Sequence, residues 1–431
     1  MKRFIAAIML LPAALIMSSC GKDEEITAIR FLFEGENDEF LTAIVKDYRE
    51  KANTLVALDA VSDNYEDELI KRLDSAAPPT IFEVHGTEEY LRLKAHCANI
   101  GGTELEGQLT DKSLALLTSE GVFGVPFSAE AFGIIYNERI MNEFFAMENR
   151  ETMIASASDI KNFDDLKEVV TEMSAKKEQL GIDGVFAAMP YDAKWAGEII
   201  SIPLYYEIER KNIDIEKGDL DKFELLYAEN LKNILDLYTE NSVVDKKDLI
   251  PISLKDAEEE FISEKCAMMI SESSVRRKIE EPEDPKKGVK MLPLYTGMDN
   301  EENDSLAVIT DKYLCINKNA SAEEQKAAQD FLCKFFSSRD GKRYVSSTLG
   351  IITPFNTFSK SELPMDALSE EVFSWINKNG LETIPLDLTL IPSEEFEQNL
   401  AMALLSYASG KKSWDSLKEE IVADWKKEIA A

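Results

Sequence analysis

Few residues of this chain stand at spacings that carry out known catalytic chemistry. The sequence contains no GxSxG, HExxH, P-loop or GxGxxG pattern, so the common nucleophile, zinc-protease and nucleotide signatures are missing. Asp299, Glu301 and Asn303 alternate as calcium-loop ligands do, but Asp304 takes the place that needs glycine and no glutamate closes the loop. We interpret this segment as a solvated acidic loop.

Carboxylates are the abundant reactive groups. Asp and Glu number 81 of the 431 residues against 48 Lys and Arg, so the formal net charge is −33. Two carboxylates at a suitable separation could cleave a glycosidic bond, which leaves a surface glycoside hydrolase as an alternative. The same charge repels phosphate backbones and anionic lipid headgroups. We therefore expect no nucleic-acid binding and no electrostatic docking on membranes.

The cysteines do not form a metal-binding pattern. Cys97, Cys266, Cys315 and Cys333 show no CxxC spacing and form no cluster with the two histidines. In strand-like or helical runs a thiol usually behaves as a small buried hydrophobe. We expect no zinc site, no other metal and no cofactor, while disulfides stay open.

The N-terminus has the form of an export signal. Two basic residues precede an apolar run, Phe4–Met17, which is short of the roughly 20 residues that span a bilayer and ends in small residues before Cys20. The stretch IMSSCG resembles a bacterial lipoprotein signal, in which the cysteine becomes the lipidated first residue. We predict a signal peptide over 1–19, a lipidated Cys20 with a tether over 20–25, and a lipid-anchored protein on the extracytoplasmic face of the cell membrane. An ordinary secretory signal is the alternative.

The first part of the mature chain alternates strands and helices. Apolar runs at 26–33, 55–58 and 80–84 predict buried strands, and amphipathic helical patterns fall between them at about 38–48 and 65–74. This order is typical of a parallel sheet with right-handed crossovers. Because a single core stops growing at roughly 250 to 300 residues, the whole chain should form at least two domains.

The predicted strand ends meet at one rim. Open sheets of this kind bind ligands where the carboxyl ends of strands adjoin loops and helix N-termini. These ends lie at 33–34, 59–61 and 83–85, and a further apolar stretch that ends at Ser128 adds a loop. In the second half, Ser321 to Glu324 forms a capping box.

The segment GVPFSAEAFGIIYN, residues 124–137, resembles the part of extracellular solute-binding proteins where the chain first leaves one lobe for the other. The resemblance is to the family 1, maltose-binding-protein-like proteins of carbohydrate ABC importers. Stretches at 79–82, 261–270, 314–321 and 350–354 agree in order, so the similarity spans nearly the whole mature chain.

This resemblance implies a two-lobed α/β fold of the periplasmic-binding-protein type II, each lobe being a mixed, mostly parallel sheet flanked by helices. Such a protein is a monomer and not an enzyme; it closes around a sugar or oligosaccharide and delivers it to an ABC permease. The crossings are expected near Ser128–Gly133, Pro293–Gly297 and Ile351–Phe355. The expected lobes are 26–130 with 298–352, and 131–297 with 353–431.

Sugar sites combine aromatic platforms with carboxylates and amides. Trp195 matches an aromatic-bearing segment of the family, and Asp192 nearby could accept from hydroxyls. After 267–270 the family usually has a glycine and a stacking aromatic, where this chain has Ser271 and polar residues, so a more polar pocket is expected. The expected ligand-binding residues are Phe33, Glu34, Glu83, His85, Ser128, Glu130, Asp192, Trp195, Ser274, Arg276, Phe396 and Glu397.

The role of these residues and the class of the solute each have an alternative interpretation. For each first-lobe residue taken alone, surface solvation or core packing is the simpler explanation, whereas as a set on one rim these residues favour a site. The excess of carboxylates also admits a cationic or metal-chelate solute in place of a sugar.

Overall fold

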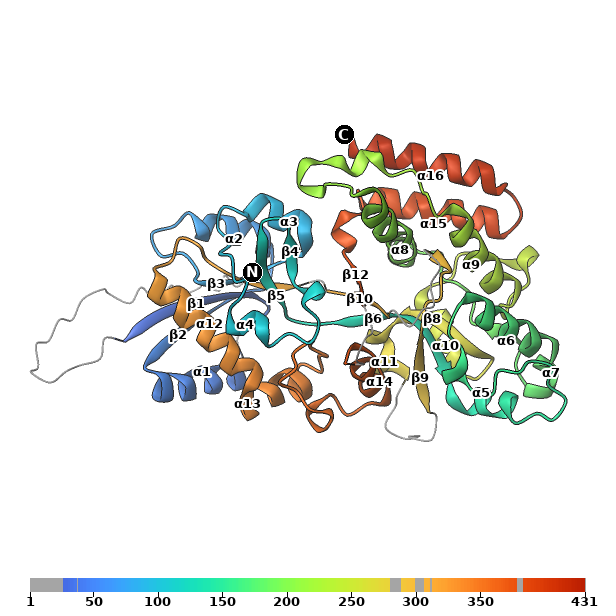
Figure 1. Ribbon diagram of the computed structural model, residues 1–431, viewed down its shortest axis with the longest axis horizontal. Coiled ribbons are helices and arrows are strands. Elements are labelled where there is room, and N and C mark those ends of the chain that lie inside the picture. The colour runs from blue at the N-terminus through green and yellow to red at the C-terminus, as the bar shows by residue number, and fades with distance from the viewer. Residues whose placement is uncertain are drawn as a thin grey trace, which may run out of the picture.

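The computed structural model describes residues 26–36, 38–279, 288–298, 306–310, 312–377 and 383–430, and all structural statements concern these residues. They form two α/β lobes that lie side by side and are joined at a narrow waist (Figure 1). The predicted signal peptide, Cys20 and the acidic loop at 299–304 lie outside the described residues.

The first lobe is built on a six-stranded sheet with the order β2-β1-β3-β11-β5-β4. Its strands are β1 (Thr27–Glu34), β2 (Thr54–Val61), β3 (Ile81–Val84), β4 (Leu116–Thr118), β5 (Gly121–Pro126) and β11 (Tyr313–Ile316). Strand β1 pairs in parallel with β2 and β3, whereas β11 pairs antiparallel with β3 and β5, and β4 with β5. The main flanking helices are α1 (Glu39–Ala52), α2 (Tyr65–Leu73), α3 (Gly86–Leu93) and α12 (Ala322–Ser337).

The second lobe is built on a sheet with the order β12-β10-β6-β8-β7, and β9 also pairs with β6. Its strands are β6 (Glu130–Asn137), β7 (Gly184–Phe186), β8 (Cys266–Glu272), β9 (Val289–Pro293), β10 (Leu306–Ile309) and β12 (Thr383–Leu386). Helices α8 (Ala193–Lys211), α9 (Ala228–Glu240), α15 (Glu394–Ala408) and α16 (Trp414–Ile429) cover one side, as Figure 1 shows in green and red. Helices α5 (Glu138–Phe145), α6 (Phe163–Ala175), α10 (Leu254–Ile262) and α14 (Ala367–Ile376) complete the lobe.

The two-lobed α/β fold with mixed sheets confirms the predicted fold class, with one correction. Parallel strand pairs do not predominate. In the second-lobe sheet, β6 pairs antiparallel with β8, β9 and β10, and only β7–β8 and β10–β12 are parallel. The reason is topological. The second-lobe sheet has β6 between β8, β9 and β10, and the direction in which the chain enters β6 makes all three of these pairs antiparallel.

The crossings between the lobes differ from those expected. The first lies between β5 and β6, near the predicted Ser128. The expected crossing at Pro293–Gly297 is wrong, because Leu294 and Tyr295 pack in the second-lobe core and β10 still belongs to the second sheet. The chain returns to the first lobe only between β10 and β11. Local apolar pattern cannot show this, since β10 would suit either sheet.

The last crossing is also displaced from Ile351–Phe355. Ile352 accepts a hydrogen bond from the Ala129 backbone at 2.8 Å and so touches the first crossing, but Phe355 stacks on Phe336 in the first-lobe core at 3.9 Å between ring centroids. The chain leaves the first lobe after Leu363. Residues 353–363 therefore belong to the first lobe and 306–309 to the second, which corrects the expected boundaries.

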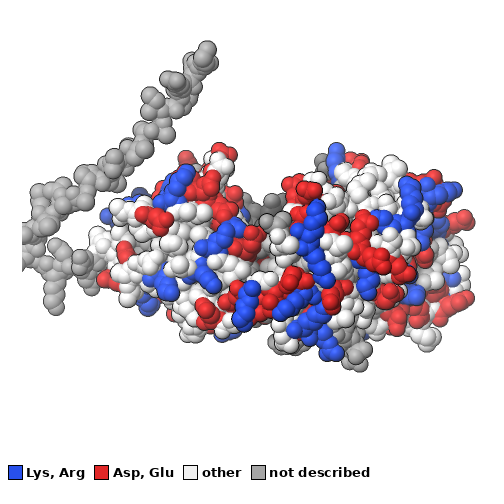
Figure 2. Space-filling view, turned by 90° about the horizontal axis from the view of Figure 1, so that it is seen from above, with Lys and Arg blue, Asp and Glu red and all other residues white. Residues whose placement is uncertain are grey.

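Local capping and cysteine state follow the sequence closely. The capping box of Ser321 and Glu324 is confirmed at the start of α12. The four described cysteines are buried and are free thiols in this structure. Among the described helices, none combines the length and apolarity needed to cross a membrane. Acidic and basic side chains are intermixed over both lobes on the face that Figure 2 shows.

Candidate functional site

A cavity of about 680 Å³ lies between the lobes, on the side where the strand ends of the first sheet meet the second lobe. Side chains from the first lobe that line it are Phe31, Phe33, Glu34, Glu36, Asp38, Leu41, Glu83, Phe127, Lys312, Phe335, Tyr344, Leu349 and Ile351. Those from the second lobe and the first crossing are Ser128, Glu130, Lys194, Glu272, Ser274, Ile309 and Leu388. We call the two sets the first-lobe wall and the second-lobe wall.

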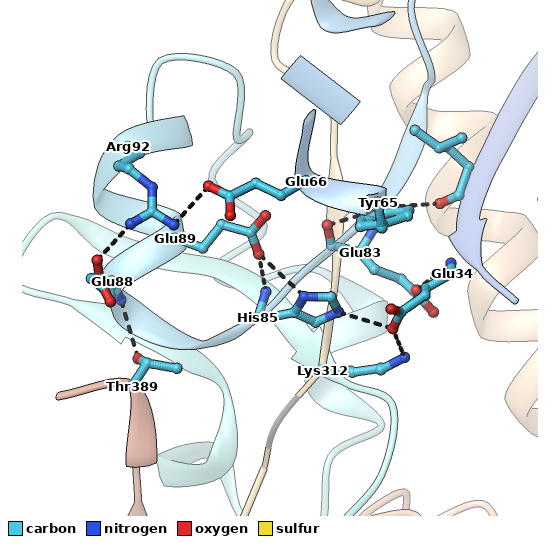
Figure 3. A network of polar contacts seen from close by, with 11 residues as sticks. Glu34, Tyr65, Glu66, Glu83, His85, Glu88, Glu89, Arg92, Lys312 and Thr389 are labelled. Carbon is cyan, nitrogen blue, oxygen red and sulfur yellow. Dashed lines mark hydrogen bonds and ion pairs between the residues drawn. The ribbon is translucent and has the colours of Figure 1, made fainter. Parts of the chain in front are cut away.

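Glu34 and Glu83 meet on the first-lobe wall because β1 and β3 are parallel neighbours whose carboxyl ends share one rim (Figure 3). The Glu34 backbone N–H donates to Glu83 Oε2 at 2.7 Å, and Lys312 Nζ donates to Glu34 Oε2. The hydrogen bond from Lys312 lowers the pKa of Glu34 below its ordinary value, against the opposing effect of partial burial. Glu34 is therefore held ionised at the cavity surface.

His85 lies directly behind this pair, at the N-cap of α3. Its Nε2 is 3.7 Å from Glu34 Oε2 and its Nδ1 is 3.7 Å from Glu89 Oε2 (Figure 3). Glu89 also accepts the His85 backbone N–H, yet burial raises the pKa of this carboxyl to about 7. The first-lobe wall thus has an ionised glutamate in front and a buried, proton-binding glutamate behind it.

Aromatic rings form much of the apolar part of the first-lobe wall, together with Leu41, Leu349 and Ile351. Phe31 and Phe33 on β1 lie 5.3 Å apart between ring centroids, and Phe335 and Tyr344 lie 6.1 Å apart. Phe127, on the first crossing, is half-buried, and the other four rings are largely buried. Rings of this kind offer apolar contact to a flat solute face.

The second-lobe wall is formed by the start of α8 and the end of β8. Lys194 Nζ lies 2.8 Å from Glu272 Oε2 and 3.6 Å from Glu198 Oε1, and Ser274 donates to Glu272 at 2.9 Å. Glu198 is buried behind the pair; its burial, reinforced by the charge of Glu272, raises its pKa well above the ordinary value. This wall has no aromatic side chain among its described residues.

Arg276 stands at the base of the second-lobe wall and faces the hinge. Its side chain is 2% exposed. It donates to Glu130 Oε2 at 2.6 Å and to the Gly350 carbonyl at 2.8 Å, and its Nε lies 3.7 Å from Asp366. One guanidinium therefore joins the first crossing to two segments that flank the last one.

The structure brings half of the predicted ligand-binding residues to the cavity. Phe33, Glu34, Glu83, Ser128, Glu130 and Ser274 line it, and His85 stands directly behind Glu34. Their role in ligand binding stays a prediction.

The other predicted residues have local structural tasks. Trp195 is 3% exposed and packs on Tyr191, so it offers no ring face to the cavity, and Asp192 caps α8 by accepting the Trp195 N–H at 2.9 Å. Phe396 is 1% exposed in the helical core, and Glu397 packs on the backbone of α8 at Gly197. The spacing that led to the prediction of a site at these residues is instead the spacing of helix ends and of the apolar helix faces that pack in the core.

Several cavity residues were not predicted. Glu272 is the last residue of β8, so the strand-end rule could have found it. Lys194 adjoins the predicted Asp192 and Trp195 but carries no signal of its own. Lys312 and Tyr344 reach the cavity from distant parts of the chain, and no local pattern announces them.

One group of side chains has the composition of a metal site. Ligand atoms of Glu34, Glu83 and His85 lie within 4.8 Å of one another. Lys312 already neutralises Glu34, and Glu83 accepts the backbone N–H of Glu34. Both carboxylates of the group therefore have a protein hydrogen-bond partner.

Comparison with known proteins places this geometry in a family. The family described as bacterial extracellular solute-binding protein matches residues 42–369, about three quarters of the chain. No curated protein sequence matches the chain.

Solved structures share the fold at low sequence identity. A family 1 extracellular solute-binding protein from Bifidobacterium longum subsp. infantis superposes with a TM-score of 0.67 at 17% identity, over 93% of this chain and 99% of its own. The sugar-binding protein MalE from Xanthomonas citri gives 0.64 at 16%, over 94% and 98%. A sugar transporter protein from Bacillus licheniformis in complex with stachyose gives 0.54 at 16%, over 93% and 100%.

Proposed function

The chain belongs to the bacterial extracellular solute-binding proteins, and from this premise we propose that it is the substrate-binding component of an ABC importer for an oligosaccharide. The observation that carries the proposal is the cavity between the lobes, whose walls combine phenylalanine rings with carboxylates. The MalE and stachyose-bound structures that share the fold are named for sugars, which supports the same solute class.

Sugar chemistry matches both parts of the cavity. The apolar face of a pyranose can pack on Phe33 and Phe127, while hydroxyls at the ring edge donate to carboxylates such as Glu83. A volume of about 680 Å³ lies within the usual range for small-molecule sites.

Because the solute contacts both lobes, its binding is coupled to their closure. A solute that touches the first-lobe wall and the second-lobe wall binds better when they approach, so its differential affinity favours the closed form. Glu130 lies on the first crossing and lines the cavity. Closure therefore changes the geometry of a residue that the solute can contact.

Isothermal titration calorimetry and thermal-shift measurements against a broad saccharide panel test the proposal. We expect at least one oligosaccharide to bind with a micromolar or lower Kd and to compact the protein in X-ray scattering. A folded protein that binds no saccharide of the panel contradicts the sugar assignment.

A cationic or metal-chelate solute is the second candidate, because six carboxylates line the cavity against two lysines, Lys194 and Lys312. Titration of the purified protein with Ca²⁺, Mn²⁺ and spermidine tests it. Tight binding of a cation that weakens steeply with salt would favour this candidate. A salt-insensitive affinity for a neutral sugar would exclude it.

We further infer that the protein carries out no reaction. Members of the matched family are binding proteins, and the sequence lacks catalytic signatures. Incubation with polysaccharides should release no reducing ends; turnover in this assay would instead identify a glycoside hydrolase.

The export signal and the family together support a lipid-anchored monomer that meets a permease at the outer face of the cell membrane. Cys20→Ser should release the protein from the membrane fraction and leave solute binding unchanged. Retention of the variant in membranes would refute the anchor, and a dimer by light scattering would refute the monomer.

A further inference from the structure

A small second cavity adjoins the main one on the second-lobe side. It has a volume of about 20 Å³ and lies under the start of α8 and the end of β8. Lys194, Glu272 and Ser274 line both cavities, so the two are neighbours across these three side chains. We call the small cavity the side pocket.

Trp195 is one of the residues that line the side pocket, and it has a buried polar atom. The residue is 3% exposed, and its Nε1 is buried and has no hydrogen-bond partner among the described residues. A buried N–H without a partner lowers stability, so proteins usually supply an acceptor. The described protein atoms supply none here.

The remaining side chains of the pocket restrict what that acceptor can be. Asp192, Glu198 and Glu272 all contribute carboxyl groups, which disfavour an anion. A simple cation cannot accept a hydrogen bond, and Lys194 already supplies positive charge next to Glu272. A hydroxyl group can accept from the indole N–H and donate to a carboxylate at the same time.

The size of the pocket points to the same group. A volume of roughly 10 to 15 Å³ is enough for one water molecule, so this pocket has space for one water-sized group and none for a sugar ring. We propose that the side pocket binds a single hydroxyl of the solute, which accepts a hydrogen bond from Trp195 Nε1–H and donates one to a pocket carboxylate. The proposal deepens the proposed function, on which it rests for the source of the hydroxyl, and makes Trp195 a specificity-determining donor in place of a stacking platform.

The four tryptophans of the chain allow a direct test. The mature protein is labelled with 15N in its indole nitrogens, and Trp195→Phe assigns the Trp195 signal. Trp414 is the matched control, since its Nε1 is also buried without a described partner but it lines neither cavity. Trp425, whose Nε1 donates to the Leu220 carbonyl at 2.8 Å, gives the reference for a bonded indole.

The probes are stachyose, chitobiose and xylotriose, together with ethylene glycol as a small diol. We expect the saccharide that binds by calorimetry to shift the Trp195 signal toward that of Trp425 and to leave Trp414 unchanged. Trp195→Phe should weaken its Kd by about 5- to 20-fold, and Trp414→Phe should change it less than twofold.

The outcomes separate the two proposals. If a saccharide binds, but the Trp195 signal stays in place and Trp195→Phe binds as the wild type does, the side-pocket proposal is overturned and the proposed function stands. If no saccharide binds, the proposed function fails. The side-pocket proposal is then tested by adding ethylene glycol and following the Trp195 signal. A shift of the Trp195 signal then supports the pocket, and no shift overturns it.

Discussion

The two walls of the cavity share a charge plan and differ in their apolar surface. Each has a lysine paired with a glutamate in front, Lys312 with Glu34 and Lys194 with Glu272, and each has a buried glutamate of raised pKa behind. Only the first-lobe wall adds aromatic rings. We infer that the first-lobe wall supplies most of the apolar binding energy. The second-lobe wall would form hydrogen bonds with the hydroxyls of the solute as the lobes close.

The difference follows from the elements that build each wall. The first-lobe wall includes the end of β1, where Phe31 and Phe33 lie on the same face of the strand, whereas the second-lobe wall takes Lys194 from the first turn of α8 and Glu272 from the end of β8. Apolar contact needs no precise geometry, but hydrogen bonds do. A charged and polar wall is therefore suited to selection at closure.

The largest expected effect lies where the walls are joined. Arg276→Met should lower the free energy of unfolding by about 3 kcal/mol, because it leaves Glu130 and the Gly350 carbonyl without their buried partner. Urea unfolding measures it. Lys255→Met, which removes an exposed ion pair, is the control and should cost under 0.5 kcal/mol. Equal effects would show that the hinge does not depend on Arg276.

The buried glutamate of the first-lobe wall should make stability depend on pH. Its pKa of about 7 exceeds the ordinary 4.5, so the folded state holds the proton more tightly than the unfolded state. The stability that this group contributes is complete below pH 4.5 and is lost as pH rises toward 7. Glu89→Gln should therefore raise the free energy of unfolding at pH 8 by about 2 kcal/mol and change it little at pH 4.5.

Urea unfolding at the two pH values measures this effect, with the exposed Glu50→Gln as control. A Glu89 variant with the same pH profile as the wild type would mean that the glutamate is not the proton-binding group. Glu198→Gln extends the comparison to the other wall, where Lys194 lies within 3.6 Å of the carboxyl.

Loss of a ring from the first-lobe wall should weaken solute binding. Phe127→Ala is expected to cost about 1.5 kcal/mol, roughly 10-fold in Kd, because a half-buried ring is exchanged for a methyl group. Calorimetry with the best-binding saccharide measures it. Leu388→Ala, on the second-lobe wall, should change Kd less than threefold. The reverse order would invert the assigned roles of the walls.

The smallest effects concern the two front lysines. Lys312→Met and Lys194→Met should each change the free energy of unfolding by less than about 1 kcal/mol, because both ion pairs are partly exposed. In urea unfolding, the difference in free energy of unfolding between each variant and the wild type should be smaller at high salt than at low salt. A loss of stability well above this range for only one of the two variants would show that the two walls do not share the same arrangement of charges.

The sequence by itself determined the local features of this protein. Alternating apolar runs located β1, β2 and β3, and the parallel order of strand and helix placed Glu34 and Glu83 on one rim. The capping box at Ser321 was equally local. These features depend on residues a few positions apart, which is why the chain reveals them without a structure.

Only the tertiary structure decided which residues share the cavity and which are buried. Lys312 and Tyr344 reach it through strand β11 and the segment after α12, and β10 joins the second sheet although its sequence suits either. Arg276 has the chemistry of a ligand contact but is enclosed by residues distant in the chain, and the ring of Trp195 is buried where a stacking platform was expected. Burial and strand order arise from long-range pairing, so no local pattern contains them.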